Sequence, residues 1–177
     1  LEMKDPASGA GGRNAGVVTM GRYYHQVHTT VLKHLSKSHP QLSGEERSNR
    51  AHEFARPYVE AGVKSNQMIE QTIADEGIDC DYVKKGWVWA AGEKDADKPL
   101  AAQRMGEETG FTDWIRISAE EAMERAGIST SFDAGYSRGT ATWHPAKWIW
   151  GLFQSALLSA DVELLTRTRV LEVVDAG

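Results

Sequence analysis

The residues best suited to chemistry gather near the start of the chain, in a glycine-rich stretch over residues 5–21. It holds five glycines, and Arg13 and Asn14 lie among them. Backbone N–H groups at such a turn can bind phosphate, because small residues let the backbone approach a ligand closely. Arg13 adds positive charge, and Asn14 both donates and accepts hydrogen bonds. Taken alone, a glycine-rich stretch is nevertheless more typical of a flexible surface loop.

A second group of candidates consists of histidines. His25 and His28 are three residues apart, and His34 and His39 follow nearby. This spacing is conceivable for a metal pair on one helix, but no Asp or Glu lies between residues 21 and 42 to complete a site. We therefore expect solvent-facing histidines rather than a metal centre.

Two further residues are weak candidates for a nucleophile or a base. Cys80 is the only cysteine and lies between Asp79 and Asp81, whose charges oppose a thiolate. His144 directly precedes Pro145, a pair that is typical of the start of a helix. We expect an inert thiol and a structural histidine.

The apolar periodicity in the first half of the chain predicts two helices. The first includes Val27 and Leu35 and ends before Pro40. Ser43 and Glu46 then form a capping box that opens a long helix over residues 45–76. We expect this helix to bend near Pro57. Its predicted inward residues are Phe54, Tyr58, Ile69 and Ile73.

The remainder of the chain alternates between helix and strand signals. A strand is predicted over residues 86–91, a helix over 100–110, and a short helix behind a second capping box formed by Ser118 and Glu121. This short helix should stop at Gly127. Residues 135–143 suggest a connector rich in glycine and threonine. A further helix starts at His144, and strands are predicted over residues 162–165 and 169–174.

Composition limits the classes of function. The formal net charge is −5 and the basic residues are dispersed, so nucleic-acid binding is disfavoured. No apolar run is long enough to span a membrane. A single cysteine excludes an intrachain disulfide framework, and we therefore expect a reducing, cytoplasmic compartment.

Residues 8–16 read Ser-Gly-Ala-Gly-Gly-Arg-Asn-Ala-Gly and follow the acidic residue Glu2. This opening resembles the D-amino-acid-oxidase and glycine-oxidase superfamily of FAD-dependent oxidoreductases. In that family the second strand ends in an acid, and a Ser-Gly-Ala-Ser-Gly-Arg-Asn loop turns into a helix. Gly11 departs from the pattern, because serine is usual there, and one hydroxyl contact to the cofactor should be lost.

The resemblance implies FAD as the cofactor, with the acid at the end of the second strand accepting hydrogen bonds from ribose hydroxyls. Residues 139–170 are similar to the family's mid-chain unit, which runs from a His-Pro entry through a helix to a strand whose valine lies by the adenine. The expected cofactor-binding residues are Glu2, Met3, Ser8, Gly12, Arg13, Asn14, Ala15, Gly16, Val17 and Val170.

The implied fold is α/β, with a Rossmann-like FAD/NAD(P)-binding core and an inserted helical and β region on the substrate side. Residues 1–25 and 141–177 would belong to the FAD-binding domain, and residues 26–140 to the helical region with its substrate-domain strand. The family's first strand and G-x-G-x-x-G turn do not precede Glu2. We therefore expect an interior piece that holds no flavin and shows no oxidase activity by itself.

The implied function of the intact protein is oxidation of the C–N bond of an amino acid or secondary amine, with hydride transfer to flavin. The expected partner is thus a small amine or amino acid, and the sequence sets neither the oligomeric state nor the catalytic residues. Trp87 and Trp89 share one face of a predicted strand, as core residues or as an aromatic wall near an amine. The alternatives are a non-catalytic flavoprotein-fold subunit and a helical interaction domain without cofactor.

Overall fold

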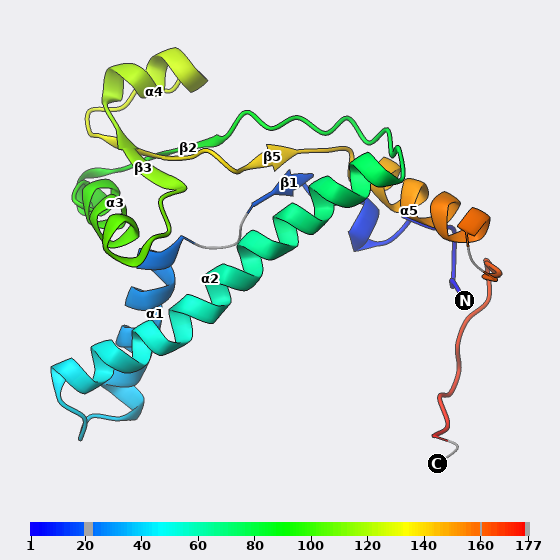
Figure 1. The fold of residues 1–177 in the computed structure, drawn as a ribbon, viewed down its shortest axis with the longest axis horizontal. Coiled ribbons are helices and arrows are strands. Elements are labelled where there is room, and N and C mark those ends of the chain that lie inside the picture. Colours follow the sequence, from blue (N-terminus) through cyan, green and yellow to red (C-terminus); the bar gives the residue numbers. More distant parts are fainter. Residues whose placement is uncertain (20–22, 160, 176–177) are drawn as a thin grey trace. The chain divides into compact units, whose positions relative to one another are not determined.

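The computed structural model describes residues 1–19, 23–159 and 161–175, so Gly21 of the glycine-rich stretch lies outside it. The chain divides into two compact units (Figure 1). Unit 1 comprises Leu1–Val18, Met68–Val83 and Thr142–Gly177, and unit 2 comprises Thr19–Gln67 and Lys84–Ala141. Among the described residues, no helix is both long and apolar enough to cross a membrane.

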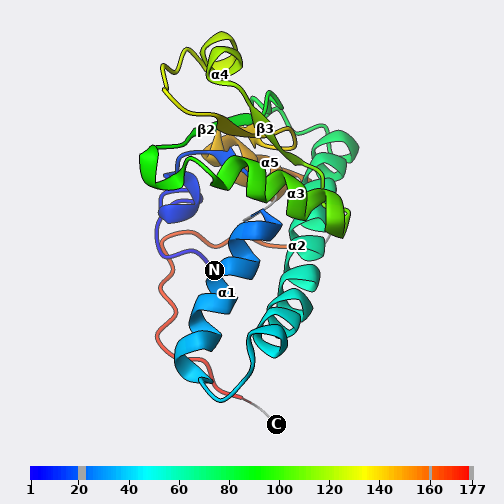
Figure 2. The ribbon, with the colours of Figure 1, turned by 90° about the vertical axis from the view of Figure 1, so that its left-hand side faces the viewer.

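Unit 2 begins with helix α1 (Tyr24–Ser38) and the larger part of helix α2 (Gly44–Asp75), which lie side by side (Figure 2). From Met68 onward α2 belongs to unit 1. The predicted capping box at α2 is confirmed. The backbone N–H of Ser43 donates to Oε2 of Glu46 at 2.7 Å, and the N–H of Glu46 donates to Oγ of Ser43 at 3.1 Å. These two bonds satisfy donors that a helix start otherwise leaves free.

The buried face of α2 differs in part from the predicted one, since Ile69 and Ile73 are half-buried but Phe54 and Tyr58 are exposed. Phe54 and Tyr58 are 55% and 45% exposed, and their rings stack on each other with centroids 6.2 Å apart. Ala51, Ala55 and Val59 are buried instead. Their small side chains let α1 approach closely, which larger rings on this face would prevent. The helix continues through Pro57 without interruption.

The core between these helices is built from few large side chains. Tyr24 and Val27 of α1 pack against Ala55 and Val59 of α2. Helix α3 (Lys98–Thr109) adds Met105 at the edge of this cluster. The predicted helices over residues 27–35, 45–76 and 100–110 are therefore confirmed.

A three-stranded antiparallel sheet completes unit 2, in the order β2 (Trp87–Ala90), β4 (Ala134–Ser137), β3 (Trp114–Ile117). Its central strand corrects the prediction of a connector over residues 135–143. The strand was not predicted because the glycine at position 135 has a low strand propensity. In the structure this glycine is required, since a Cβ there would lie 2.0 Å from Cζ2 of Trp114.

The short helix α4 (Ala119–Ala126) has only half of its predicted capping box. The N–H of Glu121 donates to Oγ of Ser118 at 3.0 Å, whereas Oε1 of Glu121 accepts from Arg125. The helix ends, as predicted, at Gly127, whose φ of 66° is left-handed. The 3-10 turn η2 (Glu93–Asp95) precedes α3.

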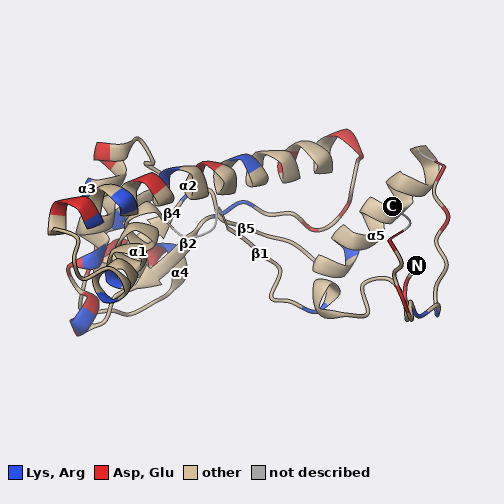
Figure 3. Ribbon diagram, turned by 90° about the horizontal axis from the view of Figure 1, so that it is seen from below, with Lys and Arg blue, Asp and Glu red and all other residues tan. Residues whose placement is uncertain are grey.

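Unit 1 contains the 3-10 turn η1 (Ala10–Gly12), strand β1 (Val17–Val18), Thr142 of β5 (Ala141–Thr142) and helix α5 (Pro145–Ser159). Strand β1 pairs with β5. Helix α5 starts at Pro145 as predicted, and Figure 3 shows it almost without charge. Its apolar stripe is only partly covered, since no described residue of α5 is fully buried.

The strands predicted over residues 162–165 and 169–174 are wrong, because residues 161–175 have no regular structure. Three backbone hydrogen bonds join residues 165–168 to Glu2 and Lys4, at 2.8 to 3.1 Å. That is too few to form a ladder, and β-rich composition without a paired neighbour does not make a strand.

The single cysteine is buried in unit 1. Cys80 is 1% exposed, and its carbonyl accepts a hydrogen bond from the N–H of His144 at 2.7 Å. Burial raises the pKa of its thiol, and the neighbouring charges of Asp79 and Asp81 raise it further. The prediction of an inert thiol agrees with this environment.

Candidate functional site

The glycine-rich loop holds its shape with its own side chains. The guanidinium of Arg13 donates to the carbonyl of Ser8. Nδ2 of Asn14 donates to the carbonyl of Gly11 at 2.7 Å, and Oδ1 of Asn14 accepts from the N–H of Gly16 at 2.8 Å. Arg13 and Asn14, which are expected to bind the cofactor, therefore also organise the loop.

The glycines of the loop have different roles. A Cβ at Gly12 would lie 2.0 Å from the carbonyl oxygen of Ala7, and one at Gly16 would lie 2.2 Å from that of Trp143. Gly16 also has a φ of +65°, which favours glycine. At Gly11 the nearest atom is Cδ1 of Ile149, at 3.0 Å, so the serine that is usual there would press on α5.

The start of η1 offers open backbone donors. Gly9 has no atom within 4 Å of its Cβ position. Among the described residues, the N–H groups of Gly9, Ala10 and Gly11 have no hydrogen-bond partner. Three free donors beside open space fit a phosphate or another anionic group of a dinucleotide. The residues present are thus compatible with FAD.

Glu2 lies beside the segment that leads to Val170. The N–H of Glu2 donates to the carbonyl of Leu165 at 2.9 Å, and the N–H of Thr168 donates to the carbonyl of Glu2 at 2.8 Å. Oε1 of Glu2 accepts from the N–H of Lys4 at 2.9 Å. The structure therefore brings Glu2 and residues 165–168 together across the length of the chain.

The other predicted cofactor residues are accessible. Met3, Val17 and Val170 are 55%, 51% and 50% exposed, and Ala15 is exposed as well. Val170 lies two residues beyond Thr168, the partner of Glu2. That all these residues contact one nucleotide stays a prediction.

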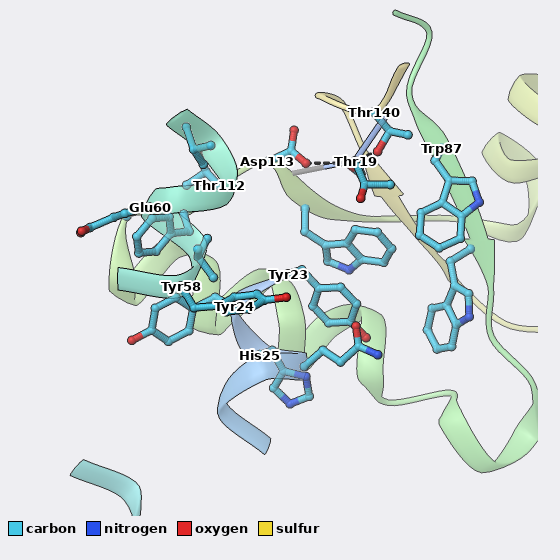
Figure 4. A pocket seen from close by; sticks show the side chains of 18 of the residues that line it. Thr19, Tyr23, Tyr24, His25, Tyr58, Glu60, Trp87, Thr112, Asp113 and Thr140 are labelled. Carbon is cyan, nitrogen blue, oxygen red and sulfur yellow. Dashed lines mark hydrogen bonds between the residues drawn. The ribbon is translucent and has the colours of Figure 1, made fainter. Parts of the chain in front are cut away.

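Unit 2 contains a cavity of about 1040 Å³. Figure 4 shows Asp113 and Thr140 at its upper end, His25 at its lower end, and Tyr23 and Trp87 between them. Among the residues that line the cavity, the sequence suggested only Trp87 and Trp89 as wall residues. The residues that it missed are Tyr23, Tyr24, His25, Phe111, Asp113 and Trp114. Apart from Asp113, these residues share only an aromatic ring, and core packing explains aromatic enrichment equally well.

The aromatic rings of the wall contact one another. Tyr23 stacks on Trp114 with centroids 4.4 Å apart, and Trp87 meets Trp114 edge-on at 6.2 Å. Trp114 is 5% exposed, whereas Trp87 remains 47% exposed. Trp87 and Trp89 both line the cavity, and that this wall lies near an amine stays a prediction.

Some polar groups of the cavity are engaged, whereas Nδ1 of His25 and Nε1 of Trp114 are buried without a hydrogen-bond partner among the described residues. Oδ2 of Asp113 accepts from Oγ of Ser137 at 2.5 Å, and Oδ1 accepts from the N–H of Gly139 at 2.6 Å. Lys98 pairs with Asp95. Burial lowers the pKa of His25, so its imidazole is neutral near pH 7.

His25 and His28 of α1 depart from the expectation that the histidines face solvent, since His25 is half-buried and His28 is buried. His28 is 5% exposed, and its ring lies 4.2 Å from that of His52. Its Nε2 is 3.3 Å from Oγ of Ser48. His34 is exposed, as expected. The residues that the structure describes contain no cluster of three or more His, Cys, Asp or Glu able to hold a metal.

Comparison with known proteins gives two findings. A family described as "FAD dependent oxidoreductase" (DAO) matches residues 1–177. The solved structure of a glycine oxidase from Bacillus cereus superposes on all of this chain with a TM-score of 0.60 at 15% identity, and the chain covers 41% of that structure. At this identity the likeness shows the fold alone. No curated protein matches the chain.

Proposed function

Because the chain belongs to the DAO family of FAD-dependent oxidoreductases, we propose that it is the part of an amine oxidoreductase that helps to bind FAD and to shape the substrate side. The reaction proposed for the whole protein is oxidation of the C–N bond of an amino acid or a secondary amine. Bound FAD supplies the acceptor for the hydride that leaves the substrate carbon. The protein residues bind the substrate, orient it and exclude water from the site.

We propose that different segments of the chain contribute to FAD binding and to the substrate side. Residues 1–25 and 141–177 contribute to a Rossmann-like FAD-binding domain, and residues 26–140 to the substrate side. Glu2 accepts from ribose hydroxyls, as acids at the ends of second strands do in dinucleotide-binding folds. The N–H groups at Gly9, Ala10 and Gly11 donate to an anionic group of the cofactor.

One observation carries the proposal: three N–H donors without partners stand beside open space at the start of η1. Gly9, Ala10 and Gly11 are exposed, so water can satisfy their N–H groups, and an anionic group of a ligand can replace that water. These donors coincide with the loop that resembles the family's cofactor segment.

The test fills the open space at Gly9 in the full-length protein that contains this chain. Gly92 is a matched control, because both glycines precede a 3-10 turn with φ near −90° and neither has an atom within 4 Å of its Cβ position. We expect Gly9→Val to weaken FAD retention about tenfold or more and Gly92→Val to leave it unchanged. Retention is measured from visible flavin absorbance after gel filtration.

Activity is tested on the same preparations. Anaerobic addition of amino acids and secondary amines should bleach the flavin of the unchanged protein. A protein that binds flavin but is bleached by none of these amines would be a non-catalytic subunit. Equal flavin retention by the two glycine variants would contradict the role of the loop. The helical interaction domain is not favoured, since a strand is present at β2.

A further inference from the structure

One face of the sheet of unit 2 carries three tryptophans, Trp87 and Trp89 of β2 and Trp114 of β3, beside the exposed Arg116 of β3. Trp87 and Trp114 both pair with Ser137 of the central strand, from opposite sides. Trp89 and Gly135 are a pair on the same face, because alternate residues of a strand point to the same side. The register therefore places the rings of β2 and β3 on either side of a strand that carries only small residues there.

The missing side chain at Gly135 shapes this face. The indole of Trp114 extends over Gly135, at the position that a Cβ would occupy. Tyr23 covers one face of that indole. The result is a floor of stacked rings, 5% exposed at Trp114, bordered by a Trp87 that is 47% exposed. Half of a large apolar ring is thus left uncovered at the edge of a cavity.

Of the four Lys, Asp and Glu residues that line the cavity, three have partners that the structure describes, and the fourth is Lys64. Lys98 pairs with Asp95, Glu60 lies 3.7 Å from Arg56, and both oxygens of Asp113 accept hydrogen bonds. A ligand that enters here therefore meets mainly aromatic rings, together with Nδ1 of His25 and Nε1 of Trp114, which are buried without a hydrogen-bond partner among the described residues. The cavity has a volume of about 1040 Å³, at the upper end of the range for sites that hold drug-sized molecules. A substrate with no side chain would leave most of it empty.

We propose that this cavity receives a large aromatic group of the substrate, so that the amine oxidised is an aryl-bearing amino acid or secondary amine rather than glycine or another small amine. The inference rests on the proposed function for the identity of the reacting amine. The aromatic group stacks against Trp87 and the floor formed by Tyr23 and Trp114. Such contacts add to the gain from burying apolar surface.

The test compares pairs of ligands that differ only in the ring. Racemic phenylalanine is compared with racemic alanine, and N-benzylglycine with N-methylglycine, by titration calorimetry with the full-length protein. We expect the aryl member of one pair or both to bind about tenfold more tightly. Trp87→Ala should abolish this preference. Trp87→Leu, which keeps apolar volume without a flat ring, should reduce it.

Trp150→Ala is the matched control, because Trp150 is 44% exposed, belongs to unit 1 and does not line this cavity. It should retain the preference for the aryl ligand. Equal affinities within both pairs, no binding of any ligand, or an unchanged preference in both Trp87 variants would overturn the proposal. An aryl preference that depends on Trp87 without any flavin reduction would instead contradict the proposed function and leave the cavity assignment standing.

Discussion

At the scale of single residues, the cofactor-like loop separates into positions that the fold requires and positions that it leaves open. A sequence motif treats its glycines alike. The structure shows Gly12 and Gly16 pressed against carbonyl oxygens, while Gly9 faces free space. The motif can be recognised from the sequence. Which of its glycines the fold requires and which face a ligand can be seen only in the structure.

This difference predicts opposite outcomes for one substitution. Gly16→Ala should reduce the free energy of unfolding by about 2 kcal/mol or more, because the new methyl meets the carbonyl of Trp143 and the left-handed φ is strained. Gly9→Ala should change it by less than about 0.5 kcal/mol. Urea denaturation measures both, and equal midpoints would refute the assignment.

The buried histidine His28 makes stability depend on pH. Burial lowers its pKa below the ordinary 6.5, and the neighbouring His52 lowers it further. The groups that face it are His52 and Ser48 from α2 and His25 from α1. The unfolded chain therefore binds more protons than the folded chain below pH 6.5. Stability should be fully present above that pH and fall as the pH drops through the lower pKa of the folded state.

Denaturation midpoints at about pH 7.5 and about pH 5 measure this effect. His28→Gln should flatten the dependence, because glutamine does not titrate. His34→Gln is the control, since His34 is exposed on the same helix and should leave the slope unchanged. A slope that persists in His28→Gln and disappears in His34→Gln would show that the burial argument is wrong.

At the scale of elements, the helices were readable from the sequence because local signals determine them. Ser43 with Glu46, Pro145 and Gly127 mark helix ends by chemistry that acts within four residues. The strands were less readable, because pairing with distant segments determines them. β4 was hidden by Gly135, whereas residues 169–174 had strand composition without a ladder. The inward face of α2 was misread in part because close helix packing favours Ala51 and Ala55 over larger rings.

The central strand supplies a test at this scale. Gly135→Ala should destabilise unit 2 by about 2 kcal/mol or more, because its methyl overlaps the indole of Trp114. It should also change the tryptophan fluorescence of the native state. Gly92→Ala is the control, with open space around its Cβ position and an ordinary φ of −90°. Native fluorescence and stability that match in the two variants would contradict the packing described for β4.

At the scale of the whole molecule, the family was identifiable from the sequence at its two ends. The residues that carry that resemblance, Glu2 and the loop at one end and Val170 at the other, fall in unit 1. The cavity lies in unit 2, where no motif pointed to it. Binding motifs act through backbone and local spacing, which a sequence displays. A cavity is formed by side chains from four or more separated segments, which a sequence does not place together.

The single buried thiol makes it possible to measure how often unit 1 opens. Cys80 belongs to unit 1 and is covered in the folded state, so a thiol reagent can reach it only when that unit opens. Labelling of the unmodified chain should therefore be slow in native buffer and immediate in denaturant. The ratio of the two rates measures how often unit 1 opens, without any engineered probe. Cofactor bound to that unit should slow labelling in proportion to its occupancy. The labelling rate of Cys80 therefore reports how much cofactor is bound.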